Sequence, residues 1–170
     1  MQTPVTLNSL SPDKIPEASA FLAQCWRAAY RGIINDGYLD ALADTHWVDF
    51  LEKSLTAKTA AGTLAEQDGK TIGLSVFGKS ITEQYPDDGE IISLYVSPQS
   101  IGQKIGHLLF ANAEQALREQ GYPGSIVCVF AENRKAIRFY ESHGYEIVMQ
   151  DQQIKMGVQG LRYVIMRKAL

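Results

Sequence analysis

The sequence predicts a mixed α/β fold, and three patterns predict it. Two apolar runs, residues 90–96 and 125–131, are too continuous for strands with one face in water and are typical of strands buried inside a sheet. Each run is followed by a segment with helical apolar spacing. Asp68 and Gly69 separate two strand-like runs, which is a strong signal for a hairpin. A strand–helix–strand–helix order in the second half is the pattern of α/β proteins.

The first half of the chain supplies a short strand, a group of helices and the hairpin. Ser11 and Pro12 provide a plausible N-cap and first helical position, and Asp44 provides an N-cap for a later helix. The expected elements are, in order, a strand at 5–10, helices at 15–34, 35–42 and 43–55, and hairpin strands at 62–67 and 70–78.

The second half alternates strands and helices before two final strands. Gly121 predicts the C-cap of the first helix, and Gly144 predicts the end of the second helix, which opens at Asn133. The expected elements are a strand at 90–96, a helix from Gly102 to Gln120, a strand at 125–131, a helix at 133–143, and strands at 145–150 and 161–170.

Length and composition predict one soluble domain over residues 1–170. The net charge of −3 and the lack of a basic stripe argue against a nucleic-acid partner. No apolar window reaches the ~18 residues of a membrane helix, and the N-terminus lacks a signal-peptide pattern, so a cytoplasmic protein with no membrane partner is expected. Cys25 and Cys128 lie far apart in apolar settings, which predicts two reduced, buried thiols. No pattern of metal ligands is present, and no metal is expected.

The stretch "YVSPQSIGQKIGHLLF" indicates a site for an anion. A buried strand ends, a turn follows, and a helix begins, so free backbone N–H groups and the positive end of the helix dipole meet there. Gly102 and Gly106 allow the backbone to approach a ligand closely. The glycine spacing is neither that of a P-loop nor GxGxxG. By itself, a turn of this kind can equally be structural.

The stretch "ENRKAIRFYESHGY" raises a second question. Asn133, Ala136, Ile137, Tyr140 and Gly144 fall on or near one face of a helix, with charged side chains on the other. An amide and a phenol therefore lie on the face that should meet the core. Periodicity alone leaves them open between packing and chemistry.

Both stretches, in this order, resemble the two signatures of the GNAT superfamily of N-acetyltransferases. The similarity extends over residues 90–147, and "CWRAAYRGII" and "RYVIMRKAL" also resemble elements of one branch of the superfamily. The resemblance implies a mixed sheet of about six to seven strands with about four helices. It also implies acetyl-CoA as co-substrate, held largely by backbone N–H groups.

One departure from the first signature stands out. Ile101 replaces the opening polar residue, and Lys104 replaces the middle glycine. Because the backbone does most of the binding in the superfamily, the binding role survives this change, and Lys104 can add a favourable charge toward phosphate. The cofactor-binding residues that the resemblance implies are Leu94, Tyr95, Val96, Ile101, Gly102, Gln103, Lys104, Gly106, His107 and Asn133.

The resemblance also implies catalytic roles. Glu90 is expected to act as a base through ordered water, the alternative being a solvent-facing carboxylate at a strand edge. Tyr140 is expected to protonate the departing thiolate, the alternative being a core aromatic residue with its hydroxyl bound to backbone. A strand bulge is expected to free the N–H of Leu94 or Tyr95 for the oxyanion, while Val96 offers its backbone to the pantetheine arm.

The acceptor is the least defined part. Trp26, Tyr30 and Ile33 could line a pocket for a primary amine, although aromatic residues at this density are equally good core residues. The hypothesis is a small-molecule acceptor, polyamine-like or amino-acid-like. The alternatives are a peptide or protein N-acetyltransferase, and a regulatory module that binds acyl-CoA without turnover. A homodimer through the terminal strands is possible within such families.

Overall fold

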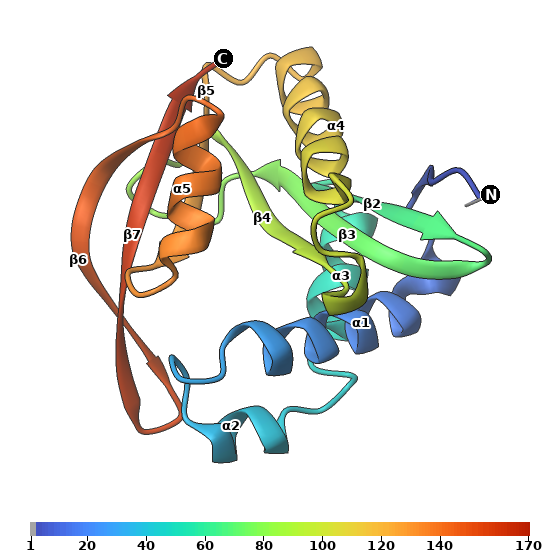
Figure 1. Cartoon of the computed structure of the whole chain (residues 1–170). Helices are drawn as coiled ribbons and strands as arrows, with labels where there is room; N and C mark the ends of the chain where they lie inside the picture. Colours follow the sequence, from blue (N-terminus) through green and yellow to red (C-terminus); the bar gives the residue numbers. More distant parts are fainter. Residues whose placement is uncertain (1–2) are drawn as a thin grey trace.

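The computed structural model describes residues 3–170 and contains one seven-stranded mixed sheet with helices on both faces (Figure 1). This confirms the predicted fold class. The strands are β1 (Thr6–Ser9), β2 (Ala60–Gln67), β3 (Lys70–Lys79), β4 (Gly89–Val96), β5 (Gly124–Phe130), β6 (Glu146–Met156) and β7 (Gln159–Ala169). The α-helices are α1 (Ile15–Ala29), α2 (Asp36–Ala41), α3 (Val48–Thr56), α4 (Ile105–Glu119) and α5 (Arg134–Ser142).

The strand order is β1-β2-β3-β4-β5-β7-β6. Strands β1 to β4 pair antiparallel, and so do β5, β7 and β6. The β2–β3 hairpin turns at Asp68 and Gly69, whose φ angles of 51° and 72° are those of a turn that suits the twist of the two strands. The two antiparallel halves meet at the single parallel pair, β4 and β5.

The helices divide between the two faces of the sheet (Figure 1). Helices α4 and α5 cover one face, where Phe110, Ile137 and Tyr140 pack on Val127 and Val129 of β5. Helices α1 and α3 cover the other face of the first half-sheet, over Leu74 and Val76 of β3. A third cluster joins the end of α1, α2 and β7 through Tyr30, Ile34, Leu39 and Leu161.

Several element boundaries differ from those predicted. A 3₁₀ turn, Pro12–Lys14, precedes α1, and α1 ends at Ala29 rather than continuing to residue 34. Asp44 does not cap α3. The helix begins after Trp47, whose backbone N–H donates to Ser19 Oγ of α1 at 3.0 Å. A contact between two helices replaces the local cap here, and local sequence does not reveal such a contact.

Helix α4 begins at Ile105, three residues later than predicted. A 3₁₀ turn, Pro98–Ser100, follows β4, and Gly102 and Lys104 then adopt φ angles of 89° and 62°. These left-handed conformations cannot continue a right-handed helix. The predicted caps Gly121 and Gly144 both have positive φ angles, 81° and 88°, and each follows the end of its helix.

The last two strands are longer than predicted. Their polar connection is part of the β6–β7 ladder, with Gln152 opposite Tyr163 and Gln153 opposite Arg162. Strand β6 lies at the edge of the sheet, where polar side chains can reach water. In residues 3–170, no helix is both long enough and apolar enough to cross a membrane.

Candidate active site

The central feature is a gap between β4 and β5. The two parallel strands pair only at Gly89 with Ser125 and at Glu90 with Ile126, and beyond these positions they diverge. The gap therefore lies between the second half of β4 and the second half of β5. It interrupts the sheet at its centre, and both helix-covered faces border it (Figure 1).

The backbone of β4 turns hydrogen-bonding groups into this gap. Ser97 donates its N–H to Ile72 of β3 at 2.8 Å. Because N–H groups alternate along an antiparallel ladder, that of Tyr95 also faces β3. The N–H groups of Leu94 and Val96 therefore face the gap. The ladder thus distinguishes between the two residues predicted for the oxyanion, and it favours Leu94.

The predicted bulge is present in β4, but it lies earlier than expected. Ile92 is the extra residue, between the positions that pair with Phe77 and Val76 of β3. A bulge increases local twist and bends the strand. This one lies just past the last β4–β5 pair, where the strands begin to diverge, so it contributes to opening the gap.

The turn before α4 presents a row of unpaired N–H groups. Within residues 3–170, the backbone N–H groups of residues 104, 105, 106 and 107 donate no hydrogen bond, whereas Gln103 donates to Ser100 at 3.3 Å. A left-handed residue followed by right-handed ones forms a concave anion-binding arrangement. The N-terminus of α4 adds its positive dipole. Six of the ten predicted cofactor residues lie together here: Ile101, Gly102, Gln103, Lys104, Gly106 and His107.

Lys104 occupies a position whose backbone conformation is left-handed. Its φ angle of 62° is the conformation for which glycine is best suited, and the superfamily signature has glycine there. The lysine keeps this backbone geometry at a conformational cost and adds a cation beside the unpaired N–H groups. Gly106 has room for a methyl group, since a Cβ there would lie 3.7 Å from Phe139 and 3.8 Å from Val96.

Helix α5 forms the next wall. Asn133 caps it as predicted, with its Oδ1 accepting the N–H of Ala136 at 3.2 Å. Tyr140 is 8% exposed and packs against Phe110 and Tyr145. Its hydroxyl has no hydrogen-bond partner in the described chain, so it is not bound to backbone. Burial raises the pKa of Tyr140 well above the ordinary value, and the nearby phenols of Tyr145 and Tyr30 raise it further. The hydroxyl is therefore a neutral donor.

Glu90 lies at the last β4–β5 pair and is 4% exposed. Its carboxylate accepts the N–H of Ile81 at 2.8 Å and the hydroxyls of Ser80 and Thr82 at 3.1–3.2 Å. Burial raises the pKa of Glu90, and these hydrogen bonds oppose the rise. The side chain is thus not a solvent-facing carboxylate. Sequence reasoning missed Ser80 and Thr82, because only the long-range β3–β4 pairing brings them to Glu90.

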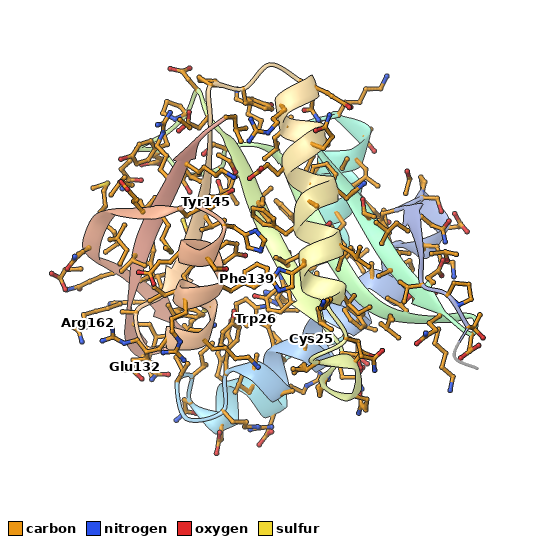
Figure 2. The ribbon with its side chains drawn as sticks, turned by 45° about the horizontal axis from the view of Figure 1, so that its top comes forward. Cys25, Trp26, Glu132, Phe139, Tyr145 and Arg162 are labelled. Atoms are coloured by element: carbon orange, nitrogen blue, oxygen red, sulfur yellow. The ribbon has the colours of Figure 1, made fainter. Side chains whose placement is uncertain are left out.

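An aromatic cluster borders the gap on the face opposite α4 and α5. Its members are Trp26 of α1, Tyr30, which is the C-cap residue of α1, Tyr95 of β4 and Phe130 of β5 (Figure 2 labels Trp26). The Tyr30 ring meets those of Trp26 and Phe130 edge-on at 5.0 Å each, and the Tyr30 and Tyr95 hydroxyls are 2.7 Å apart. Burial raises the pKa of Tyr30 to about 12. Ile33 packs against this cluster from the turn after α1.

The cysteines differ from each other and, in part, from the prediction. Cys25 is buried, but Cys128 is exposed, on the face of β5 opposite Val127 and Val129. That face is not covered by α4 or α5, so an apolar strand sequence does not ensure burial there. Burial raises the pKa of Cys25 to about 12. The Cys128 side chain is exposed, but the surrounding protein keeps enough water away from the sulfur to raise its pKa to about 11, against the opposing effect of Thr82 Oγ1 at 3.3 Å from the sulfur. Neither thiol is activated as a nucleophile.

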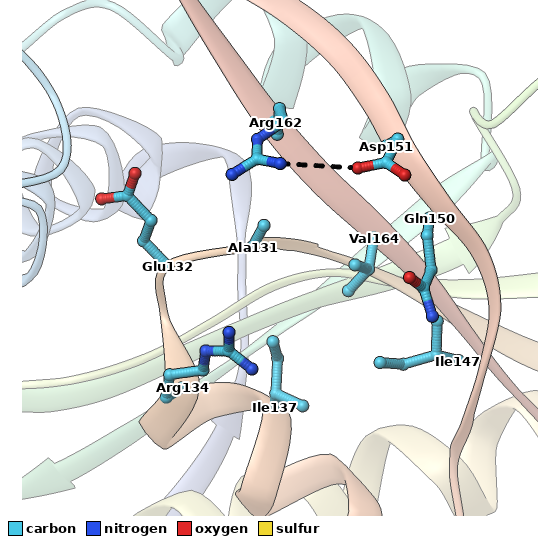
Figure 3. A pocket seen from close by; sticks show the side chains of 9 residues that line it. All are labelled: Ala131, Glu132, Arg134, Ile137, Ile147, Gln150, Asp151, Arg162 and Val164. Atoms are coloured by element: carbon cyan, nitrogen blue, oxygen red, sulfur yellow. Dashed lines mark ion pairs between the residues drawn. The ribbon is translucent and has the colours of Figure 1, made fainter.

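A separate hollow of about 270 Å³ lies between the start of α5 and strands β6 and β7 (Figure 3). Glu132 and Arg134 line one side, and on the other Arg162 and Asp151 form an ion pair with an N–O distance of 3.6 Å. Its charges are balanced within the protein. Among residues 3–170, no three His, Cys, Asp or Glu side chains gather closely enough to hold a metal ion.

Comparison with known proteins agrees with this geometry. The family model described as "Acetyltransferase (GNAT) family" matches residues 21–145, which is more than half of the chain. The chain therefore belongs to the GNAT acetyltransferase family. The matched segment begins in α1 and ends after α5, so it includes the gap, the turn before α4 and helix α5.

Two solved structures share the fold over almost the whole chain. PaiA N-acetyltransferase from Thermoplasma acidophilum, solved in complex with coenzyme A, has a TM-score of 0.77 and 20% identity, covering 98% of this chain and 99% of that one. YncA from Salmonella typhimurium, a putative acetyltransferase solved with acetyl-CoA, has a TM-score of 0.73 and 18% identity, covering 98% and 94%. At these identities the likeness shows the fold alone.

Two curated relatives match a shorter segment. Mycothiol acetyltransferase from Thermomonospora curvata is 36% identical over 83 residues, which is 48% of this chain and 26% of the relative. Mycothiol acetyltransferase from Brachybacterium faecium is 32% identical over 73 residues, 43% of this chain and 22% of the relative. The matched segment thus spans about a quarter of the length of these relatives.

Proposed function

We propose that the protein is an N-acetyltransferase that moves the acetyl group of acetyl-CoA to a primary amine of a small molecule by direct attack. The observation that carries the proposal is the gap between β4 and β5. It has an anion-binding turn at one end, a buried phenol on one face and a buried carboxylate at its closed end. Family membership supports the reaction class.

The donor fits the groups around the gap. The unpaired N–H groups of residues 104–107 and the Lys104 ammonium suit a pyrophosphate. The N–H and C=O of Val96 suit a pantetheine arm that lies along β4 like an added strand. Asn133, which caps α5, has its amide NH₂ left for a cofactor contact. When bound, acetyl-CoA supplies the reactive thioester.

The catalytic groups follow from their positions. The N–H of Leu94 would donate to the oxyanion, and Glu90 would accept a proton from the amine through water. Tyr140 would donate a proton toward the sulfur. It is the one phenol bordering the gap from α5, and the raised pKa keeps its proton at neutral pH. Cys128 needs no role as an acyl carrier, because its thiol is not activated.

The acceptor is proposed to approach from the face that carries the aromatic cluster. Trp26, Tyr30 and Ile33 provide an apolar wall there, and Glu90 provides a carboxylate for the amine. The names of the curated relatives favour a small molecule. One structural neighbour from Brucella melitensis is a ribosomal-protein-alanine N-acetyltransferase, so peptides form the alternative class.

The test is thiol release from acetyl-CoA over a panel of acceptors. The panel should hold polyamines, free amino acids, an amino sugar, a cysteine conjugate and a peptide with a free N-terminal alanine. We expect turnover with at least one of the small amines. Turnover with the peptide alone would mean that the acceptor is a peptide and not a small molecule. Tight binding of acetyl-CoA without turnover on any acceptor would favour a regulatory module instead.

A further inference from the structure

Two histidines join α4 to α5 beside the proposed phosphate site. His107 lies in the first turn of α4, and its backbone N–H is one of the four unpaired N–H groups. His143 is the C-cap residue of α5. The Nδ1 of His107 and the Nε2 of His143 are 2.8 Å apart, which is a hydrogen bond between the two rings. The chain contains three histidines, so two of them are committed to this one contact.

The pair lies among aromatic rings and near two charged groups. Phe139 of α5 contacts both imidazoles, with centroid distances of 5.0 Å and 4.8 Å, and the ring of Phe110 lies 4.1 Å from that of His143. Lys168 of β7 and Glu114 of α4 face His143 and bind each other at 2.8 Å. Burial lowers the pKa of His143, and His107 and Lys168 lower it further, while Glu114 opposes them.

This geometry limits the pair to one proton beyond the neutral state. In a hydrogen bond between two imidazole nitrogens, one must donate and the other must accept. If both rings were charged, both nitrogens would be donors, and two positive charges would lie against each other. A nearby anion favours the singly protonated pair, because an opposite charge stabilises the charged form.

We propose that the His107–His143 pair is a proton site coupled to cofactor binding, and that His143 is its positioning residue. The pair takes up a proton when the pyrophosphate binds at the start of α4, and His143 holds the His107 ring on α5 in both states. This inference rests on the proposed function, because it places the cofactor's phosphates at the α4 turn.

The sign of the linkage follows directly. Burial lowers the pKa of His143 in the free protein, and bound phosphate raises it by stabilising the charged form. Between these two values, binding is accompanied by proton uptake, so affinity rises as pH falls through this window. Above the higher value and below the lower value, the pair no longer makes the affinity change with pH.

The test is calorimetric titration with dephospho-CoA, which keeps the pyrophosphate and lacks the 3′-phosphate. The second ionisation of a phosphate monoester falls near pH ~6 and would otherwise obscure the signal. Titrations in two buffers of different ionisation enthalpy, repeated from about pH 5.5 to about pH 8, give the number of protons taken up. We expect uptake of a fraction of one proton, and a Kd that tightens several-fold toward low pH.

Two variants and a control separate the pair from the rest of the protein. His143→Gln keeps a side chain that can hydrogen-bond to His107 and leaves one titratable ring in place of two; we expect the proton uptake and the midpoint of the pH dependence to change. The double variant His107→Gln/His143→Gln removes both rings, and there we expect almost no proton uptake and a flat pH dependence. His46→Gln, at an exposed histidine that contacts Trp47, should behave like the unmodified protein.

Two results would overturn the inference. Binding of dephospho-CoA with equal proton uptake in the unmodified protein and in both pair variants would remove the pair from the linkage and leave the cofactor site intact. Absence of dephospho-CoA binding in the unmodified protein would overturn both the inference and the proposed cofactor site. Inorganic phosphate must be left out of the buffers, because it competes for the same N–H groups.

Discussion

Tyr140 and Tyr145 are two buried phenols on adjacent elements, and their hydroxyls have different surroundings. The Tyr145 hydroxyl is 2.6 Å from Ser125 Oγ, inside the core. The Tyr140 hydroxyl has no partner within residues 3–170 and borders the gap. A buried phenol usually finds a partner within the fold. The Tyr140 hydroxyl is not among the fully buried polar atoms without a partner, so it can donate to water or to a bound molecule.

Tyr140→Phe should lower kcat about 10–100-fold, at the lower end of general-acid effects, because a thiolate leaves tolerably well without help. The Kd for acetyl-CoA should change less than about twofold, and the stability should be preserved, because no hydrogen bond within the protein is lost. Steady-state kinetics and thermal unfolding measure these effects.

Tyr145→Phe is the matched control for this prediction. It removes the hydrogen bond to Ser125, so the free energy of unfolding should fall by about 1 kcal/mol while kcat stays within about twofold. Equal kcat values in the unmodified protein and in Tyr140→Phe over the whole pH range would exclude Tyr140 as the general acid.

Glu90 should set the acidic limb of the pH–rate profile. A base must be ionised to accept a proton, and burial raises the pKa of Glu90 above the ordinary value of 4.5. The value of kcat/KM should therefore fall as pH drops through this raised pKa. In Glu90→Gln, kcat/KM should be reduced about 10–1000-fold, and the limb should disappear.

Thr82→Val tests the same pH dependence without removing the Glu90 carboxylate. It removes one of the donors that stabilise the ionised carboxylate, so the acidic limb should move to higher pH. A limb at the same pH in the unmodified protein and in Thr82→Val would show that another group controls the profile.

For the turn before α4, the prediction concerns the whole element, because the proposed function of the turn depends on its backbone conformation. Gly102 has a φ angle of 89°, and Gly106 lies in the right-handed first turn with room for a methyl group. Gly102→Ala should therefore lose about 1–2 kcal/mol of stability and weaken acetyl-CoA binding. Gly106→Ala should leave the stability and the affinity for acetyl-CoA almost unchanged, and the alanine should favour the helix slightly.

Denaturant unfolding and calorimetry compare the two glycine variants directly. The two substitutions add the same methyl group four residues apart, so a difference between them reports backbone conformation. Similar losses of affinity in both variants would mean that the added methyl groups, and not the shape of the turn, determine binding.

The sequence predicted those features that local chemistry controls. Asn133 caps α5, Asp68 and Gly69 form the hairpin turn, and Gly144 follows the end of its helix; each depends on residues within one turn. The turn before α4 was located by its glycines and by the family resemblance, although the helix begins later because Lys104 is left-handed.

Features that depend on distant residues were missed or misplaced. The start of α3 depends on Ser19 of α1, and the donors to Glu90 come from the loop after β3. Cys128 is exposed because neither α4 nor α5 covers its face of β5, which an apolar run cannot indicate. The aromatic cluster needed Phe130 from β5 as well as the predicted Trp26 and Tyr30. Contacts between elements that are distant in the sequence determine all of these.

At the scale of the whole molecule, the sheet is two antiparallel half-sheets joined by a short parallel contact. A donor lying between β4 and β5 would contact both halves. Acetyl-CoA at about 100 times its Kd should then add about 2.7 kcal/mol of stability and raise Tm by about 5–10 °C. Thermal unfolding with and without acetyl-CoA measures this shift.

Hydrogen exchange should show which parts of the protein acetyl-CoA stabilises. Protection should increase in β4, in β5, at the start of α4 and in α5, and should change little in β1. ATP at equal concentration serves as the control for general phosphate binding. An equal shift in Tm with ATP would indicate a nucleotide site instead of an acetyl-CoA site.

The divergence of β4 and β5 has a topological consequence. Tyr140 borders the gap on the face of α4 and α5, while the aromatic cluster borders it on the other. A conjugate that linked the sulfur of CoA to a bulky amine would thus pass through the gap in the sheet, with one end on each face. Because β4 and β5 pair only at one end of the gap, such a molecule could leave along the diverging strands without breaking the hydrogen bonds between the half-sheets. Its residence time would then depend on contacts made on both faces of the sheet at once, so weakening either end should shorten it.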